Sequence, residues 1–120
     1  MSKNLKDIVV NALEDVKGKD IITLDVSDLT DIMDTSIVVS GTSNRQVKGL
    51  ANNAIDDGKK AGFRPIGIEG MESGEWVLVD FGDIVLHVML PTTREFYELE
   101  KLWSVRPSDL NADSEDRQEG

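Results

Sequence analysis

The sequence contains no cysteine and only one histidine among its 120 residues. Without cysteine there can be no disulfides, cysteine-ligated zinc, iron–sulfur cluster or thiol nucleophile, so the chain suits a reducing compartment. With one histidine, general-base chemistry falls to His87 or to a carboxylate. No stretch approaches the ~18 apolar residues of a membrane span, and the first residues lack the apolar segment of a signal peptide. We therefore expect a cytoplasmic protein.

Positive charge is scarce, because 13 lysines and arginines stand against 23 aspartates and glutamates, a net charge of −10. Such a chain repels a phosphate backbone unless its cations gather on one face, and a basic protein is the better expected partner. Residues 20–34 and 69–83 each carry five carboxylates and no lysine or arginine. The cations that do gather lie around the second predicted helix: Arg45, Lys48, Lys59, Lys60 and Arg64. The sequence thus predicts a polarised molecule.

The length and the 39% hydrophobic content allow one domain with a stable core. Apolar periodicity predicts helices from about Ser2 to Gly18, from Ser43 to Gly62 and from Thr92 onward. It predicts strands over residues 21–26, 36–40, 65–68, 76–80 and 84–90. This order indicates a single α/β domain over residues 3–104, with a mixed sheet of about five strands covered by helices. Residues 105–120 are predicted to form an acidic, disordered tail.

The last two strands read as a hairpin around Phe81–Gly82–Asp83. A two-residue connection would place Trp76 opposite His87, and a three-residue turn would change this register. One face of the hairpin is wholly apolar and must belong to the core. The other face mixes aromatic, apolar and acidic side chains and is the candidate contact face.

Signals for catalysis are weak. The chain has neither a P-loop nor a G-x-S-x-G nucleophile elbow. The segment Gly41–Thr42–Ser43 could hold an anion, although a turn glycine followed by a helix cap explains it better. Asp80, Asp83 and Asp25 with Mg²⁺ would make a small nucleotidyltransferase-like enzyme, which is the alternative hypothesis. The favoured interpretation is that Asp83 shapes the turn and that His87 is a polar surface residue on its strand.

Several segments, taken in order, resemble one known family. They are Asp25–Val26–Ser27 with Leu29–Thr30, residues 40–48 (SGTSNRQVK), Glu69–Gly70, residues 74–88 (GEWVLVDFGDIVLHV) and residues 94–103 (REFYELEKLW). Together they resemble the ribosomal silencing factor family, also called Iojap-like, and the likeness runs from about Leu5 to Trp103.

The resemblance implies a domain with nucleotidyltransferase-like architecture but no active site, cofactor or metal. It implies a translational repressor that binds the large ribosomal subunit through its fourteenth protein and sterically blocks joining of the small subunit. It also implies a role in large-subunit biogenesis for some relatives. A ribosomal RNA contact through the cations of the second helix would be accessory, and the sequence leaves open whether the chain forms a homodimer. The predicted contact residues are Trp76, Leu78, Asp80, His87, Met89 and Tyr97, of which Trp76, Leu78 and Met89 could instead be core.

Overall fold

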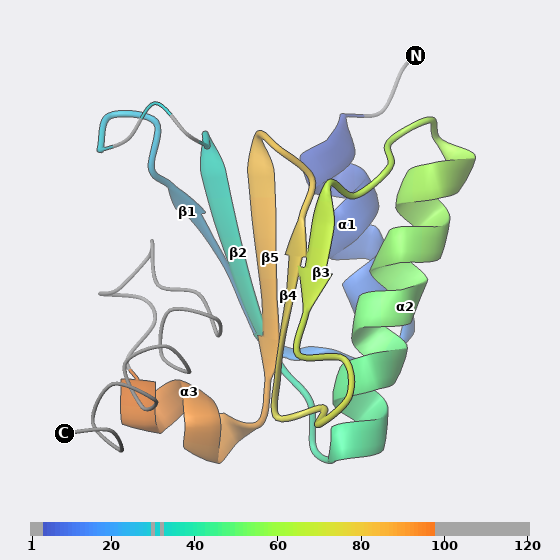
Figure 1. Cartoon of the computed structure of the whole chain (residues 1–120), viewed down its shortest axis with the longest axis vertical. Coiled ribbons are helices and arrows are strands. Elements are labelled where there is room, and N and C mark those ends of the chain that lie inside the picture. Colours follow the sequence, from blue (N-terminus) through green and yellow to red (C-terminus); the bar gives the residue numbers. More distant parts are fainter. Residues whose placement is uncertain (1–3, 30, 32, 98–120) are drawn as a thin grey trace, which may run out of the picture.

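The computed structural model describes residues 4–29, 31 and 33–97, with the side chains of residues 96 and 97 left out. The elements in chain order are α1 (Leu5–Asp15), β1 (Lys19–Asp25), β2 (Thr35–Ser40), α2 (Asn44–Lys60), β3 (Gly67–Glu69), β4 (Trp76–Asp80), β5 (Ile84–Met89) and α3 (Pro91–Tyr97). This α/β domain with a five-stranded mixed sheet confirms the predicted fold class (Figure 1). The predicted tail lies outside the described residues.

The sheet has the strand order β1-β2-β5-β4-β3. Strands β2 and β5 pair in parallel at its centre, and every other neighbouring pair is antiparallel. Strand β2 is buried at five of its six positions, as its run of β-branched residues predicts for a central strand.

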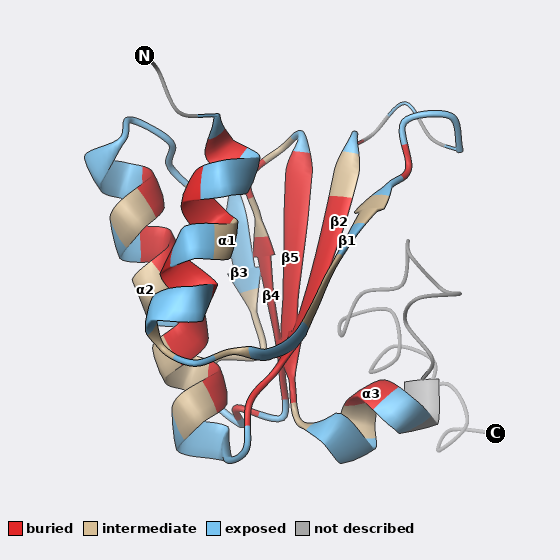
Figure 2. Ribbon diagram, turned by 180° about the vertical axis from the view of Figure 1, so that it is seen from behind, coloured by how far each residue is buried: buried red, intermediate tan, exposed pale blue. Residues whose placement is uncertain are grey.

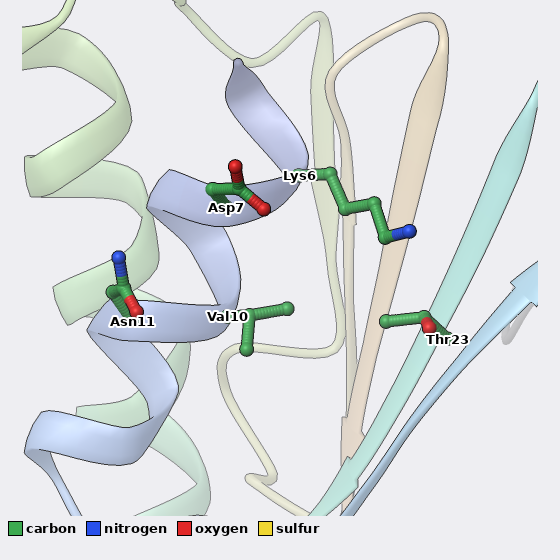
Figure 3. Close-up of a pocket in the computed structure, with 5 residues that line it drawn as sticks. All are labelled: Lys6, Asp7, Val10, Asn11 and Thr23. Carbon is green, nitrogen blue, oxygen red and sulfur yellow. The ribbon is translucent and has the colours of Figure 1, made fainter. Parts of the chain in front are cut away.

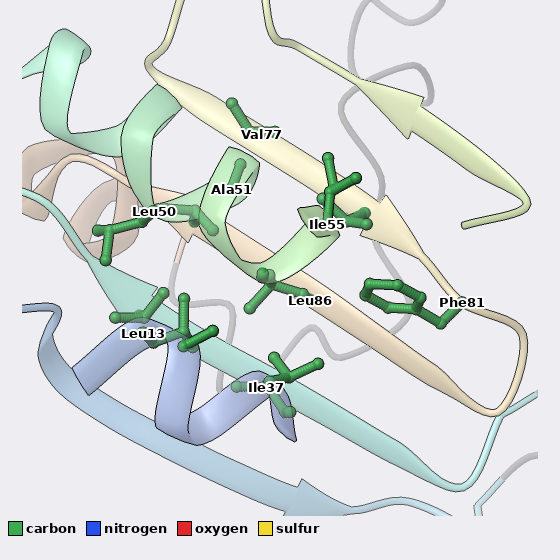
Figure 4. Packing of buried hydrophobic residues seen from close by; sticks show 14 of the residues in the cluster. Leu13, Ile37, Leu50, Ala51, Ile55, Val77, Phe81 and Leu86 are labelled. Carbon is green, nitrogen blue, oxygen red and sulfur yellow. The ribbon is translucent and has the colours of Figure 1, made fainter. Parts of the chain in front are cut away.

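Helices α1 and α2 pack side by side on one face of the sheet, while α3 lies beyond the other face, at one end (Figures 1 and 2). The core between α1, α2 and the sheet is built from the apolar faces that the sequence pattern predicts. Leu13 on α1 and Leu50 on α2 are fully buried against Ile37, Val77 and Leu86 of the strands (Figure 4).

Local signals explain where the two long helices begin. Asn4 caps α1 by accepting a hydrogen bond from the N–H of Asp7, so α1 begins at Leu5, three residues later than a start at Ser2. Ser43 caps α2 through the N–H of Gln46, as predicted. The Gln46 side chain accepts hydrogen bonds from the N–H and the hydroxyl of Thr42 and donates to the carbonyl of Val16. Gln46 therefore ties the start of α2 to the end of α1.

Helix α3 begins at Pro91, not after a cap at Thr92. Proline is favoured in the first helical turn because it has no N–H to leave without a partner. The buried Arg94 holds α3 to strands β1 and β2. It donates to the carbonyl of Asp20 at 2.7 Å and to the hydroxyl of Ser40 at 3.0 Å. The predicted continuation of this helix beyond Tyr97 lies outside the described residues.

The register of the β4–β5 hairpin differs by two residues from the prediction. Trp76 lies opposite Met89, and Leu78 lies opposite His87, because the tight turn is centred on Gly82 and Asp83 and not on Phe81 and Gly82. Gly82 adopts a positive φ of 99° in that turn, and the N–H of Phe81 donates to the carbonyl of Ile84. A shift of two residues leaves each side chain on its face, so the predicted division into a core face and a contact face still holds.

Candidate functional site

The candidate site is the face of β4 and β5 that points away from α1 and α2, here called the second face. It is formed by three pairs of opposing residues: Trp76 with Met89, Leu78 with His87, and Asp80 with Val85. The alternate residues of the same strands, such as Val77, Val79 and Leu86, belong to the core under the helices. The second face therefore brings together the five predicted contact residues that lie in the hairpin.

A hydrogen bond within the second face joins Trp76 to His87. The indole Nε1–H donates to His87 Nδ1 at 3.1 Å, and the ring centroids are 5.9 Å apart. Because Nδ1 accepts, that nitrogen carries no proton in this arrangement. His87 is only 1% exposed, so its interpretation as a polar surface residue was wrong. Its polarity serves a buried contact on the shared face, which strand alternation alone does not predict.

The apolar part of the second face is buried in this structure. Trp76 is 6% exposed, Leu78 1% and Met89 0%. Leu78 and Val85 form a small cluster with Val26 and Met33 from the segment between β1 and β2. These burials fit the alternative that the three side chains are core, while their role as contact residues stays a prediction.

Carboxylates border the second face and are its more accessible part. Asp80 is half-buried, and its Oδ1 accepts a hydrogen bond from the N–H of Gly82 at 2.8 Å. Asp83, in the turn that follows, is exposed, whereas the loop that carries Glu72 and Glu75 packs against the start of α2, where Asn44 donates to the carbonyl of Ser73. Tyr97, the sixth predicted contact residue, is the last residue of α3, and its side chain lies outside the described part.

The groups needed for the alternative enzyme lie at opposite ends of the sheet. Asp25, Asp80 and Asp83 lie at the end where β2 begins, whereas Gly41–Ser43 follows the other end of β2. Ser43 caps α2, and a Cβ on Gly41 would meet Val47 at 3.0 Å, so packing explains this segment. Within residues 4–97 as described, no three histidine or acidic side chains could together hold a metal ion.

The structure also shows a hollow that sequence reasoning missed, between α1 and the edge strand β1 (Figure 3). Its volume is about 350 Å³, and its lining includes Lys6, Val10 and Thr23. A neighbouring hollow of about 420 Å³ shares Lys6 and Thr23 and adds Asp25 and Ser27. No motif marks this place, because it arises from the gap that an edge strand leaves beside a helix.

Three exposed apolar side chains are a second feature that the sequence pattern did not single out. Phe63 is 37% exposed, Ile66 74% and Ile68 44%. All three lie in or just before the edge strand β3. Isoleucines that alternate around Gly67 predict a strand but do not reveal that this strand is an edge.

Ser27 lowers the pKa of Asp25 from its ordinary value of 3.8, mainly because its hydroxyl donates to Asp25 Oδ1 at 2.7 Å and its N–H at 3.1 Å. A depressed carboxyl pKa stabilises the fold above the unfolded-state pKa, and this contribution disappears as the pH falls through the folded-state pKa. We expect Ser27→Ala to raise the pKa of Asp25, as measured by NMR titration of its side-chain carboxyl. The same titration with Thr23→Ser, which leaves both hydrogen bonds in place, should show no rise.

The fold and the site define a small α/β domain with a five-stranded mixed sheet, two helices on one face and an aromatic and acidic hairpin surface on the other. The family described as "Ribosomal silencing factor during starvation" matches residues 1–120. The chain is 54% identical over 101 residues to Ribosomal silencing factor RsfS of Chromobacterium violaceum, which covers 84% of this chain and 83% of that protein. The chain belongs to the ribosomal silencing factor family, whose members act in translation regulation and are not enzymes.

Two further comparisons bear on the fold and on function. A crystal structure of a Chromobacterium violaceum protein superposes with a TM-score of 0.82 at 52% identity, covering 88% of each chain. The mouse protein named "Mitochondrial assembly of ribosomal large subunit protein 1" is 37% identical over 106 residues, which is 86% of this chain and 46% of that protein. None of the helices within the described residues is long and apolar enough to cross a membrane.

Proposed function

We propose that this chain represses translation by binding the large ribosomal subunit through its fourteenth protein, so that the small subunit cannot join. Family membership supports the repressor role. The structural observation that supports the mode of binding is the acidic border of the second face, made by the half-buried Asp80 and the exposed Asp83. Ribosomal proteins are strongly basic, and opposite charges around an interface speed association and fix its orientation.

Steric obstruction needs little more than bulk in the right place. A standard interface buries about 800 Å² on each partner, which a domain of this size can supply from one face of its sheet. The rest of the domain, with α1 and α2 on the opposite side, would then stand where the second subunit docks (Figure 2). The proposed site therefore requires no reaction, cofactor or metal.

The buried centre of the second face bears on how contact would occur. Trp76, Leu78, His87 and Met89 are at most 6% exposed, so a partner could touch them only where the face is uncovered in the complex. The acidic border needs no such change. We propose that the border makes the first contact and that the apolar centre, with Tyr97 nearby on α3, forms the final one.

The variant Asp80→Asn tests the charge of the border with little change in shape. An amide oxygen can still accept the hydrogen bond from Gly82, so the turn keeps its geometry. We expect affinity for purified large subunits to fall roughly two- to fivefold at low salt, the range typical of one exposed ion pair. The loss should shrink as salt rises.

The matched control for this variant is Glu14→Gln, which removes one exposed carboxylate from α1 on the other side of the sheet. It should leave affinity unchanged. Equal losses of affinity in both variants would show that net charge alone governs binding. The proposal that the second face is the binding surface would then be contradicted.

A second function, in biogenesis of the large subunit, is favoured by the similarity to the mouse protein named for mitochondrial assembly of the large ribosomal subunit. We propose that binding to the same site on an immature particle would serve assembly. Cells that lack the chain should then accumulate large-subunit precursors during growth, as resolved by sucrose gradients. Both functions place the chain in the cytoplasm, where ribosomal subunits assemble and join.

A further inference from the structure

The outward face of α2 carries a row of cations in an otherwise acidic molecule. Residues 44–64 hold five lysines and arginines and two carboxylates. The rest of the chain holds eight lysines and arginines and twenty-one carboxylates. Arg45, Lys59 and Lys60 are exposed, and Lys48 is half-buried. Among the described residues, none of these four side chains forms an ion pair. Their charges are therefore available to a partner.

Helical geometry places these cations on one stripe, here called the α2 stripe and defined as Arg45, Lys48, Gly49, Asn52, Lys59 and Lys60. At 3.6 residues per turn, all six point within about 60° of the direction of Arg45. The buried residues of α2, such as Val47, Leu50 and Ala54, point the opposite way into the core. The exposed Asp56 lies on the same side of α2, between Asn52 and Lys59, and is the one carboxylate of the helix there. From Arg45 to Lys59 the stripe runs about 21 Å along the helix axis.

Gly49 lies within this stripe and has no structural reason to be glycine. A Cβ at Gly49 would meet no described atom within 4 Å, whereas one at Gly58 would meet Phe81 at 3.1 Å and the carbonyl of Phe63 at 3.3 Å. Packing explains Gly58, but Gly49 weakens the helix without a packing benefit. A glycine on an exposed helix face lets another backbone approach closely.

We propose that the α2 stripe docks on the phosphate backbone of a structured RNA, with Gly49 as the point of closest approach. Spaced cations over about 21 Å match a repeating polyanion such as an RNA strand. Asn52 can donate a hydrogen bond to a phosphate or a ribose hydroxyl without adding charge. Because the rest of the molecule is acidic, RNA can approach only from this side.

This inference extends the proposed function, since a large subunit would present such RNA at high local concentration. The α2 stripe and the second face lie on opposite sides of the sheet, so both can be occupied together (Figure 2). The inference can nevertheless be tested without ribosomes.

The test measures binding of the full chain to a 20-base-pair RNA duplex across a salt series that starts at low ionic strength. The double variant Arg45→Gln with Lys59→Gln should lower affinity roughly tenfold and reduce the slope of log affinity against log salt by about two, one for each cation removed. The control is Lys17→Gln with Lys19→Gln, which changes net charge equally at exposed positions outside α2. The affinity and the salt slope of this control should match those of the unmodified chain.

Variants at Gly49 test whether RNA approaches the helix backbone closely, without changing the charge of the α2 stripe. Gly49→Ala should raise the thermal midpoint, because alanine favours a helix and meets no atom there. Gly49→Gln should stay folded but lose several-fold in RNA affinity, because its side chain holds the backbone away. Equal affinity of the unmodified chain and Gly49→Gln would overturn the assignment of Gly49.

Two results would overturn the RNA proposal itself. The first is equal binding of the duplex by both double variants. The second is a combination of two observations: the unmodified chain does not bind the duplex at all, and the Arg45 and Lys59 double variant binds large subunits more weakly. That combination would show that the α2 stripe contacts a protein and not RNA. Failure of the proposed function would look different, because Asp80→Asn would then leave subunit binding intact whatever the duplex shows.

Discussion

Replacing Gly70 with alanine should lower the free energy of unfolding by about 3 kcal/mol. Gly70 has a φ of +83°, a region that L side chains rarely adopt. A Cβ at this position would also overlap the carbonyl oxygen of Trp76, a backbone atom of β4 that cannot rotate away. The chain must therefore shift at the start of β4, which is the strand that positions the second face. Urea denaturation followed by circular dichroism measures the effect.

The neighbouring Gly67 provides the matched control for this change. It lies in the edge strand β3, and a Cβ there would meet no atom within 4 Å. Gly67→Ala should therefore change stability by no more than about 1 kcal/mol, with stabilisation expected because alanine restricts the unfolded chain. Similar losses for Gly67→Ala and Gly70→Ala would show that the close approach to Trp76 is not what requires glycine.

Replacing Trp76 with alanine should lower the free energy of unfolding by about 3 kcal/mol, because a large buried side chain leaves a cavity. It also removes the indole donor to His87 Nδ1. If Trp76 contacts the partner as proposed, affinity for large subunits should fall by about 1 kcal/mol or more, a loss of fivefold or more. Affinity must be measured well below the thermal midpoint of the variant, so that the folded fraction stays complete.

The variant Trp76→Phe separates these two effects. Phenylalanine keeps most of the apolar volume but cannot donate to His87, which should cost about 1 kcal/mol of stability. Since the hydrogen bond is internal to the second face, affinity should fall less than in Trp76→Ala. Unchanged affinity in Trp76→Ala, with the expected loss of stability, would show that Trp76 is a core residue only.

The element order could be predicted from the sequence because each element has its own periodicity and its own end signals. Ser43 with Gln46 marked the start of α2, and the β-branched run 36–40 marked a strand buried on both faces. The start of α3 could not be predicted in the same way, because Thr92 with Glu95 imitates a capping box. Pro91, which begins the helix, could equally have ended the preceding strand.

Face assignment could be predicted better than register. Alternation separates Val77 and Val79 from Trp76 and Leu78 whatever the turn length. The pairing itself depends on the positive φ of Gly82 and on the bond from Phe81 N–H to Ile84, which adjacent residue types do not reveal. The predicted pairing is off by two residues, which keeps opposing residues on the same face, whereas an offset of one would have paired residues from opposite faces.

The candidate site could be predicted as a face but not as a set of exposed side chains. The sequence places His87 and Trp76 on the same face, yet their shared hydrogen bond and deep burial depend on long-range packing. The role of Arg94 was also beyond local signals, because its partners Asp20 and Ser40 lie more than 50 residues away in the chain. By contrast, the cations of α2 needed only helical spacing to be placed on one stripe.

Steric obstruction of subunit joining is tested most directly by measuring the rate of joining. Purified large subunits are incubated with the protein, small subunits are added, and light scattering follows the rate at which intact ribosomes form. Saturating protein should slow joining strongly, and Asp80→Asn should require a higher concentration for the same effect. Joining at the unmodified rate with every large subunit occupied would contradict obstruction, whatever surface the protein uses to bind.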